Sequence, residues 1–429
     1  MSRGWALALT LFALVGFTQI SYATDIVGTW TGTWTKNGDA LPVSVTFFRS
    51  DGSISGSFDS DALQVAGIPF REVNYTPPNI HFVLAGDTST STFDGALKDG
   101  IVEGTFADGG TKGSFRLVRT QAAQPAIRAR EITFNNGDVR LAGTLFLPQS
   151  AGAHPAIVFL HGSGAEGRWA NHYLAERFAK SGFVALIYDK RGVGQSIGDW
   201  HTAGFEDLAD DALAGIRFLQ AQPEIDKKKI GIYGHSQGGT LAPLVAARAG
   251  DLAFVIGSAA GGIDPAEMEE YSVGNSIDIS SLPPHEAVDA KAFVSAIVDV
   301  GYRGKPRAQL DLLSTRFKDR AWHFDPPPPD NFYWSFARRI AAYNPARYWR
   351  QVNAPVLLLF GARDQRVPPV RSSSAIIAAL HSVGNETVTL RMFPEADHTF
   401  NLPVPNGSWP KHVPDYADIM IAWAHDKAK

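Results

Sequence analysis

Five short, mainly apolar runs recur after residue 150 of this 429-residue chain, and they constrain its fold more than any other feature. Such runs are typical of strands buried on both faces of a parallel sheet. Helical patterns lie between them, and strands that alternate with helices predict a mostly parallel α/β sheet with helices on both faces. The runs are 156–160, 184–188, 229–233, 254–258 and 356–360, and the helical patterns are 170–181, 206–221, 239–249 and 371–381.

The strongest local motif is Gly234-His235-Ser236-Gln237-Gly238, which lies between the third apolar run and a helical pattern. This strand–turn–helix placement is typical of a nucleophile elbow, in which the central serine projects from a sharp turn. The turn is so tight that small residues are needed on both sides of the serine, and the two glycines meet this requirement. We therefore expect Ser236 to be a nucleophile rather than a structural serine.

A serine hydroxyl is a weak nucleophile near neutral pH, so it needs a general base, and the base needs an orienting acid. Asp364 follows the last apolar run, at the carboxyl end of a strand, where open α/β sheets place their ligand sites. A further strand pattern at 388–393 is followed by His398. The chain order serine, acid, histidine predicts that Asp364 orients His398 and that His398 accepts the serine proton.

Other polar residues compete for these two assignments. Asp397 directly precedes His398, but adjacent residues rarely face each other in the geometry that an acid and a base require. His235 precedes the serine, and we interpret it as a packing residue or a residue of the pocket rim. His412 and His425 belong to no motif. The assignments made from chain order are therefore preferred.

The loop His161-Gly162-Ser163-Gly164 follows the first apolar run. A loop in this position donates one backbone N–H to the oxyanion that forms during acyl transfer, and the residue after the nucleophile donates the second. We expect the loop donor to be Ser163 rather than Gly164, and the second donor to be Gln237. Each donor of this kind contributes about 3 kcal/mol to stabilisation of the transition state.

These motifs, with the stretches 188–196 and 361–364, resemble those of serine hydrolases of the α/β-hydrolase superfamily. Within it, residues 128–429 most resemble the dienelactone-hydrolase-like and prolyl-oligopeptidase-like branch of esterases. True dienelactone hydrolases carry a cysteine nucleophile, and the N-terminal part of this chain is too short for the propeller of prolyl oligopeptidases. The resemblance implies an α/β-hydrolase sheet with a helical cap insertion, and it favours esterase over peptidase activity.

The chain between the fourth and fifth apolar runs is far longer than a crossover connection needs. We expect a cap insertion at about 263–350. Aromatic residues in the cap could line a pocket for an apolar or aromatic acyl or alcohol group, or they could form the core of the cap itself. These residues are Phe324, Phe332, Tyr333, Trp334, Phe336, Tyr343, Tyr348 and Trp349.

Arg191 lies in a loop on the expected active-site side of the sheet. It could bind a carboxylate of the substrate, because a guanidinium group matches carboxylate geometry. The preferred interpretation is that Arg191 pairs with Asp189 or Asp207 and orders the loop.

Residues 24–120 differ in composition from the α/β domain at 131–429, to which the linker at 121–130 connects them. Their apolar residues alternate with polar ones, and turn signals such as Asp51-Gly52 and Asp99-Gly100 separate the runs. This pattern predicts a small all-β domain, barrel- or sandwich-like. Such a domain could bind a small apolar ligand or dock a substrate or partner, but we prefer a packed unit without its own pocket.

Residues 1–23 have the features of a secretory signal peptide, with Arg3, an apolar stretch at 5–17 and the cleavage pattern Ser21-Tyr22-Ala23. The chain has no cysteine, which excludes disulfides, thiolate metal sites and a lipoprotein anchor. Its net charge of -4 argues against binding to nucleic acid or docking on an anionic membrane. We expect an exported bacterial protein, periplasmic or extracellular, with no stable membrane anchor after cleavage.

The sequence therefore predicts a secreted carboxylic-ester hydrolase that forms an acyl-enzyme on Ser236 and acts on a small-molecule ester. No phosphate-binding loop, dinucleotide fingerprint or cluster of metal ligands is visible, so we expect no cofactor and no metal. Two alternatives stay open: a peptidase, amidase or acyl transferase with the same triad, and a catalytically silent binding protein on the same fold. Nothing in the sequence specifies an oligomeric state.

Overall fold

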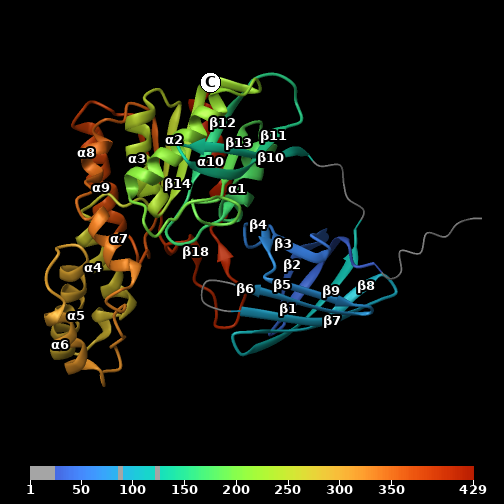
Figure 1. Ribbon diagram of the computed structural model, residues 1–429, viewed down its shortest axis with the longest axis horizontal. Helices are drawn as coiled ribbons and strands as arrows, with labels where there is room; N and C mark the ends of the chain where they lie inside the picture. Colours follow the sequence, from blue (N-terminus) through green and yellow to red (C-terminus); the bar gives the residue numbers. More distant parts are fainter. Residues whose placement is uncertain (1–24, 86–89, 121–125) are drawn as a thin grey trace, which may run out of the picture.

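The computed structural model describes residues 25–85, 90–120 and 126–429. The expected signal peptide at 1–23 and residues 121–125 of the expected linker lie outside the described residues. Within the described ranges, no helix combines the length and the apolar character that crossing a bilayer requires. The chain forms a nine-stranded sheet followed by an eight-stranded sheet with its helices (Figure 1).

The N-terminal unit is a single antiparallel sheet with the strand order β4-β3-β2-β1-β9-β8-β7-β6-β5. Asp51-Gly52 and Asp99-Gly100 have positive φ angles between consecutive strands, as tight hairpins require. The strands are β1 (Gly28–Lys36), β2 (Asp39–Ser50), β3 (Ser53–Ser60), β4 (Val65–Pro69), β5 (Glu72–Thr76), β6 (Asn79–Ala85), β7 (Thr90–Lys98), β8 (Ile101–Asp108) and β9 (Thr111–Arg119).

This sheet curls around an aromatic core, but its edge strands β4 and β5 do not pair within the described residues. It is therefore an open half-barrel, which agrees with the barrel-like alternative of the expected all-β domain, because all nine strands share one hydrogen-bonded sheet. Phe82 and Phe93 stack in the core with ring centroids 4.5 Å apart. Trp409, from the C-terminal part of the chain, packs near Trp34 and Phe106. Side chains thus fill the interior that a small ligand would have to occupy.

The second sheet has the order β10-β11-β13-β12-β14-β15-β16-β17. β11 pairs antiparallel with β10 and β13, and the remaining pairs are parallel. All five apolar runs lie in parallel strands of this sheet. The strands are β10 (Ile127–Asn136), β11 (Val139–Pro148), β12 (His154–Leu160), β13 (Val184–Tyr188), β14 (Ile225–His235), β15 (Phe254–Ser258), β16 (Val356–Gly361) and β17 (Val388–Phe393).

Helices cover both faces of this sheet, and each face has its own apolar core. On one face pack α2 (Phe205–Gln220), α3 (Gln237–Ala249), α8 (Pro345–Trp349) and α9 (Pro369–His381). On the other face pack α1 (His172–Lys180) and α10 (Tyr416–Lys427). The short 3-10 helix η1 (Arg168–Asn171) precedes α1.

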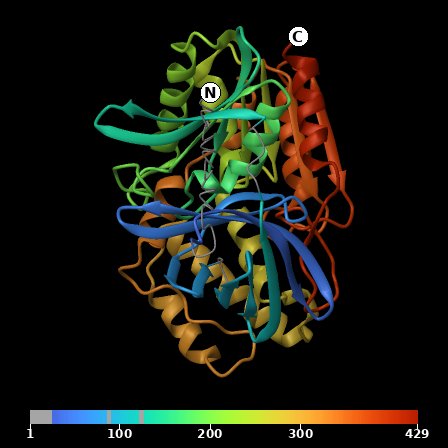
Figure 2. The ribbon, with the colours of Figure 1, turned by 90° about the vertical axis from the view of Figure 1, so that its right-hand side faces the viewer.

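The chain between β15 and β16 forms a helical insertion with a separate apolar core. The insertion consists of α4 (Pro265–Ser276), η2 (Ile279–Ser281), α5 (Pro284–Gly301), α6 (Ala308–Phe317) and α7 (Phe332–Ile340), and α8 follows it. Trp334 and Phe324 belong to this core, whereas Tyr343 and Trp349 belong to the core of the sheet domain. In Figure 2 the cap helices, yellow and orange, lie at the end of the molecule opposite the C-terminal helix, red.

The two units are in contact through a loop between β17 and α10 that carries the short strands β18 (Asn401–Leu402) and β19 (Lys411–His412). Trp409 donates its indole N–H to the carbonyl oxygen of Asp39 at 3.0 Å. Asn37 donates to the carbonyl oxygen of Gly407 at 3.2 Å. Helix α1 also contacts strand β4. The half-barrel is therefore held beside the edge of the sheet at which the parallel strands end (Figure 1).

Candidate active site

The turn from β14 into α3 holds Ser236 in a strained conformation, with φ 55° and ψ −116°. The turn brings the backbone so close that a Cβ atom on Gly234 would lie 2.2 Å from the carbonyl oxygen of Gly238. A Cβ atom on Gly238 would lie 2.8 Å from the carbonyl oxygen of His161. Both positions therefore require glycine, as the sequence motif indicates, and the turn packs directly against the loop after β12.

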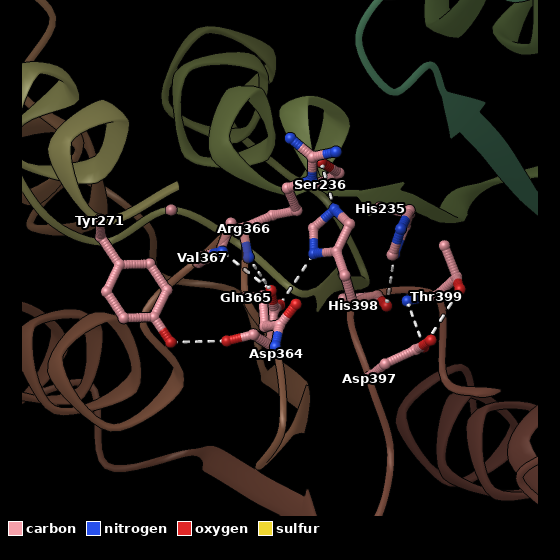
Figure 3. A network of polar contacts seen from close by, with 12 residues as sticks. His235, Ser236, Tyr271, Asp364, Gln365, Arg366, Val367, Asp397, His398 and Thr399 are labelled. Carbon is pink, nitrogen blue, oxygen red and sulfur yellow. Dashed lines mark hydrogen bonds and ion pairs between the residues drawn. The ribbon is translucent and has the colours of Figure 1, made fainter. Parts of the chain in front are cut away.

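Three polar side chains from distant parts of the chain meet at this turn (Figure 3). The Ser236 hydroxyl lies 2.9 Å from Nε2 of His398, and Nδ1 of His398 lies 2.8 Å from Oδ2 of Asp364. The Asp364 side chain is fully buried, whereas the His398 side chain is 18% exposed. With Nδ1–H donating to the carboxylate, Nε2 of the imidazole is free to accept the serine proton.

The loop after β16 fixes the Asp364 carboxylate. Its other oxygen, Oδ1, accepts hydrogen bonds from the backbone N–H groups of Arg366 at 2.7 Å and Val367 at 2.8 Å. Tyr271, from cap helix α4, donates its hydroxyl to the carbonyl oxygen of Asp364 at 2.6 Å. The carboxylate is thus held by its own loop, and the cap braces the loop from outside.

The rival residues have other partners. Asp397 accepts hydrogen bonds from the backbone N–H groups of Thr399 and Asn401, so it closes its own loop (Figure 3). The Nδ1 atom of His235 lies 3.1 Å from the Ser258 hydroxyl. Burial, with smaller contributions from His398 and His412, lowers the pKa of His235 to about 3, so its ring is neutral at physiological pH. His425, outside this site, contacts the carbonyl oxygen of Ser181.

The loop after β12 lies next to the serine turn. The Gly162 N–H donates to the Glu166 carboxylate at 2.6 Å, so it is not available to a substrate. No hydrogen bond from the N–H of Ser163, Gly164 or Gln237 to another described residue is present. Ser163 and Gln237 therefore both have an unused N–H near the serine, and the choice of Ser163 over Gly164 stays a prediction.

Lys190 holds the loop after β12 in place through hydrogen bonds, and the sequence alone assigned this residue no function. Its side chain is 2% exposed, and its ammonium group donates to the carbonyl oxygens of Gly162 and Gly164, each at 2.6 Å. Burial lowers the pKa of Lys190 to about 8, although the charge of Glu166 acts in the opposite direction. A buried lysine thus fixes the peptide unit that carries the Ser163 N–H and the one that follows Gly164. The position of Lys190, two residues beyond the end of β13, is the sequence signal that could have indicated this.

The family model for the X-Pro dipeptidyl-peptidase (S15 family) matches residues 136–394, which is more than half of the chain. The chain belongs to this S15 family. The matched stretch begins at Asn136, the last residue of β10, and ends just beyond β17, before His398.

Individual relatives of this S15 chain include esterases. Esterase EstD of Thermotoga maritima is 22% identical over 314 residues, which cover 70% of this chain and 66% of the relative. The quorum-quenching protein AidA of Acinetobacter baumannii is 32% identical over 127 residues, which cover 29% of this chain and 42% of the relative. This chain thus spans less than two thirds of the length of either relative. The solved structure of Pyrococcus furiosus esterase Pf2001 is 18% identical with a TM-score of 0.46, over 72% of this chain and 92% of that one.

In this S15 chain Arg191 has a structural partner. Its guanidinium group donates to both carboxylate oxygens of Asp211, at 2.7 and 2.8 Å. Of the two expected partners, Asp207 forms a looser ion pair with Arg191 at 3.8 Å and accepts a hydrogen bond at its carbonyl oxygen at 3.0 Å, whereas Asp189 binds Arg168. Asp211 lies one helical turn beyond Asp207 on α2, so it could not be told from Asp207 by sequence alone.

Two hollows border the triad of the S15 chain. The first, which we call the triad hollow, has a volume of about 340 Å³ and is lined by His398, Arg363, Arg366, Glu395 and Asp397 among others. The second, the domain cleft, has a volume of about 370 Å³. Its walls combine Gly162, His235 and Thr399 with residues 63–65 of the half-barrel. None of the eight cap aromatics lines either hollow, so most of them form protein core instead.

Proposed function

We propose that this chain is an exported carboxylic-ester hydrolase in which Ser236, His398 and Asp364 form a catalytic triad. The observation that carries this proposal is the unbroken pair of hydrogen bonds from the serine hydroxyl through the imidazole to the buried carboxylate. A serine in a strained turn at the start of a helix, with an acid and a histidine in this order along the chain, meets the geometric requirements of acyl transfer.

In the proposed reaction the Ser236 hydroxyl oxygen attacks the ester carbonyl carbon while Nε2 of His398 takes its proton. Charge then develops on the former carbonyl oxygen, and the N–H groups of Ser163 and Gln237 stabilise it. As the bond to the alcohol breaks, His398 returns the proton to the leaving alcohol, and an acyl-enzyme remains on Ser236. A water molecule, deprotonated by His398, then releases the acid and regenerates the serine.

The buried Asp364 has two functions in this scheme. It holds Nδ1–H of His398, so that Nε2 faces the serine, and its negative charge stabilises the imidazolium that forms after proton transfer. Backbone donors already satisfy its second oxygen, so the carboxylate does not need to move during the reaction. The Asp397 carboxylate does not bind His398 in this way, because it accepts hydrogen bonds from backbone N–H groups of its own loop.

The triad is tested with Ser236→Ala, His398→Ala and Asp364→Asn on a 4-nitrophenyl ester. Each variant is expected to lower kcat/KM by about three orders of magnitude or more, and the double variant of Ser236 and His398 by hardly more, because triad residues act as a unit. Asp397→Asn is the matched control, and its loss should stay below about tenfold because its carboxylate only closes a loop. Substantial turnover by Ser236→Ala would refute the proposed mechanism.

Amide or peptide hydrolysis by the same triad is the second candidate, because the matching family carries the name of a peptidase. Comparing kcat/KM for an ester and an anilide of the same acyl group distinguishes the two activities. Ester turnover is expected to dominate, and efficient release of aniline from peptide anilides would favour the peptidase. A fluorophosphonate probe separates both from a silent binding protein, since only an activated serine becomes labelled.

We also propose export to the periplasm or the medium, because residues 1–23 combine a basic start, an apolar stretch and a small-residue cleavage pattern. N-terminal sequencing of the protein recovered from the periplasmic or culture fraction tests this. The expected first residue is Thr24, and an intact N-terminus in the cytoplasm would contradict it.

A further inference from the structure

Arg366 is a cation beside the triad for which the described chain provides no counterion. It follows Asp364 by two residues, and its side chain is exposed and lines the triad hollow together with His398. In Figure 3 this side chain extends from the acid loop toward the Ser236 end of the triad. No carboxylate of the described residues lies within ion-pair distance of its guanidinium group.

The other charges around the triad hollow are already paired or bonded. Arg363 lies 3.3 Å from the Glu395 carboxylate, and both side chains are exposed. Asp397 accepts hydrogen bonds from the backbone N–H and the hydroxyl of Thr399. One guanidinium group at the rim of the reaction centre thus remains uncompensated.

One acid of the cap, Glu269, interacts electrostatically with Arg366, but the two form no ion pair in the part of the chain that the structure describes. Glu269 on α4 accepts the Tyr333 hydroxyl at 2.7 Å. Burial raises the pKa of Glu269, and the opposing contributions of Tyr333 and of the Arg366 charge do not reverse this. Glu269 is therefore committed to the cap, and Arg366 stays open to a ligand in the hollow.

A guanidinium group offers parallel N–H donors that match a carboxylate, and it binds anions most strongly where water is partly excluded. We infer that Arg366 binds a carboxylate of the substrate, so that the preferred substrates are esters with a free carboxylate on the acyl side, such as half-esters of dicarboxylic acids. This inference rests on the proposed ester hydrolysis at Ser236 and adds the substrate class to it. Arg191, which the sequence offered for this function, is instead occupied by Asp211, which binds its Nε and Nη2 atoms, and by the carbonyl oxygen of Asp207.

The test compares mono-4-nitrophenyl adipate with 4-nitrophenyl hexanoate, which differ only in a terminal carboxylate in place of a methyl group. The measured quantity is the ratio of the two kcat/KM values, after subtraction of spontaneous hydrolysis. Arg366→Gln is expected to lower this ratio by about 10- to 100-fold, the range of a charge-assisted hydrogen-bonded pair. Arg366→Lys should give an intermediate ratio, because lysine keeps the charge without the fork of donors.

Arg371→Gln is the matched control, because it removes the same charge from the neighbouring helix α9, where Arg371 pairs with Glu267. The control should keep the ratio of the unmodified protein. An unchanged ratio in Arg366→Gln, or an equal fall in Arg371→Gln, would overturn the inference. If Ser236→Ala hydrolysed both esters as well as the unmodified protein, the proposed triad would fail instead, so the two failures are distinguishable.

Discussion

Replacing Lys190 with methionine tests whether a buried ammonium group positions the oxyanion loop. Methionine has a similar length and shape but donates no hydrogen bond. The change removes the bonds to the carbonyl oxygens of Gly162, which shares a peptide unit with the Ser163 N–H, and of Gly164. Since those bonds fix the direction of the Ser163 N–H, their loss should weaken stabilisation of the transition state.

The structure limits how much stability this change can remove. Two hydrogen bonds from a charged donor contribute about 3–6 kcal/mol in total. Burial of the ammonium group opposes this, because lowering the pKa of Lys190 from 10.5 to about 8 corresponds to about 3 kcal/mol. The free energy of unfolding should therefore fall by only about 1–2 kcal/mol, as an order of magnitude. A complete oxyanion donor is worth a factor of about 100–1000 in kcat, so a misdirected one should reduce kcat by about tenfold or more.

Steady-state kinetics on a neutral 4-nitrophenyl ester measure this effect. We expect kcat to fall while KM changes little, because the oxyanion forms only in the transition state. Lys180→Met is the matched control, since Lys180 lies at the surface of α1 and pairs with Glu176. A rise in KM at constant kcat, or equal losses in both variants, would refute the positioning of the loop by Lys190.

The pH dependence gives a second readout with opposite signs for activity and stability. In the folded protein Lys190 loses its proton near pH 8, so activity should decline above pH 8 as the bonds to the loop weaken. Between about pH 8 and 10.5 the unfolded chain binds more protons at this lysine than the folded chain, so its contribution to the free energy of unfolding rises with pH. Lys190→Met should lack both trends. An alkaline decline of the same size in the variant would contradict this assignment.

Two further variants test contacts between parts of the molecule. Tyr271→Phe removes the hydrogen bond from the cap to the carbonyl oxygen of Asp364. In ester kinetics kcat/KM should fall by a factor of about 3–10, and in urea titrations the free energy of unfolding should fall by about 1 kcal/mol. Unchanged values would mean that the cap does not brace the acid loop. Trp409→Ala removes a half-buried indole from the core of the half-barrel, together with its hydrogen bond to Asp39. The free energy of unfolding, measured by urea titration followed by circular dichroism, should fall by about 2 kcal/mol. A loss below about 0.5 kcal/mol would refute this docking contact.

Local motifs allowed the chain segments around the reaction centre to be predicted. The elbow can be recognised because its geometry excludes every residue larger than glycine at positions 234 and 238. The steric requirement of the turn therefore appears in the sequence as two glycines around the serine. The positions of Asp364 and His398 follow from the strands that precede them, since strand ends in a parallel sheet converge on one edge. The distances among the three side chains needed the structure, which brings Ser236 and His398 together across 162 residues of sequence.

Contacts between the half-barrel and the α/β domain left no comparable signal in the sequence. The half-barrel closes around its aromatic core with the help of Trp409, which lies some three hundred residues beyond β9, and no periodic pattern connects the two. For the same reason residues 63–65 gave no indication that they border a cleft beside His235. The preferred interpretation, a packed unit without its own pocket, therefore did not include the wall that the half-barrel contributes to a cleft shared with the α/β domain.

The two arginines near the triad show why the charge of a residue does not determine its function. Arg191 and Arg366 each lie in a loop after a parallel strand, on the edge of the sheet where Ser236 lies. Asp211 on α2 points its carboxylate at Arg191, whereas the acid on the cap side of Arg366, Glu269, is held by Tyr333. Whether such a cation orders a loop or meets a substrate therefore depends on whether a carboxylate elsewhere in the chain reaches it. No such carboxylate pairs with Arg366, because Tyr333 holds Glu269 within the cap. The guanidinium group therefore stays available to a substrate in the triad hollow.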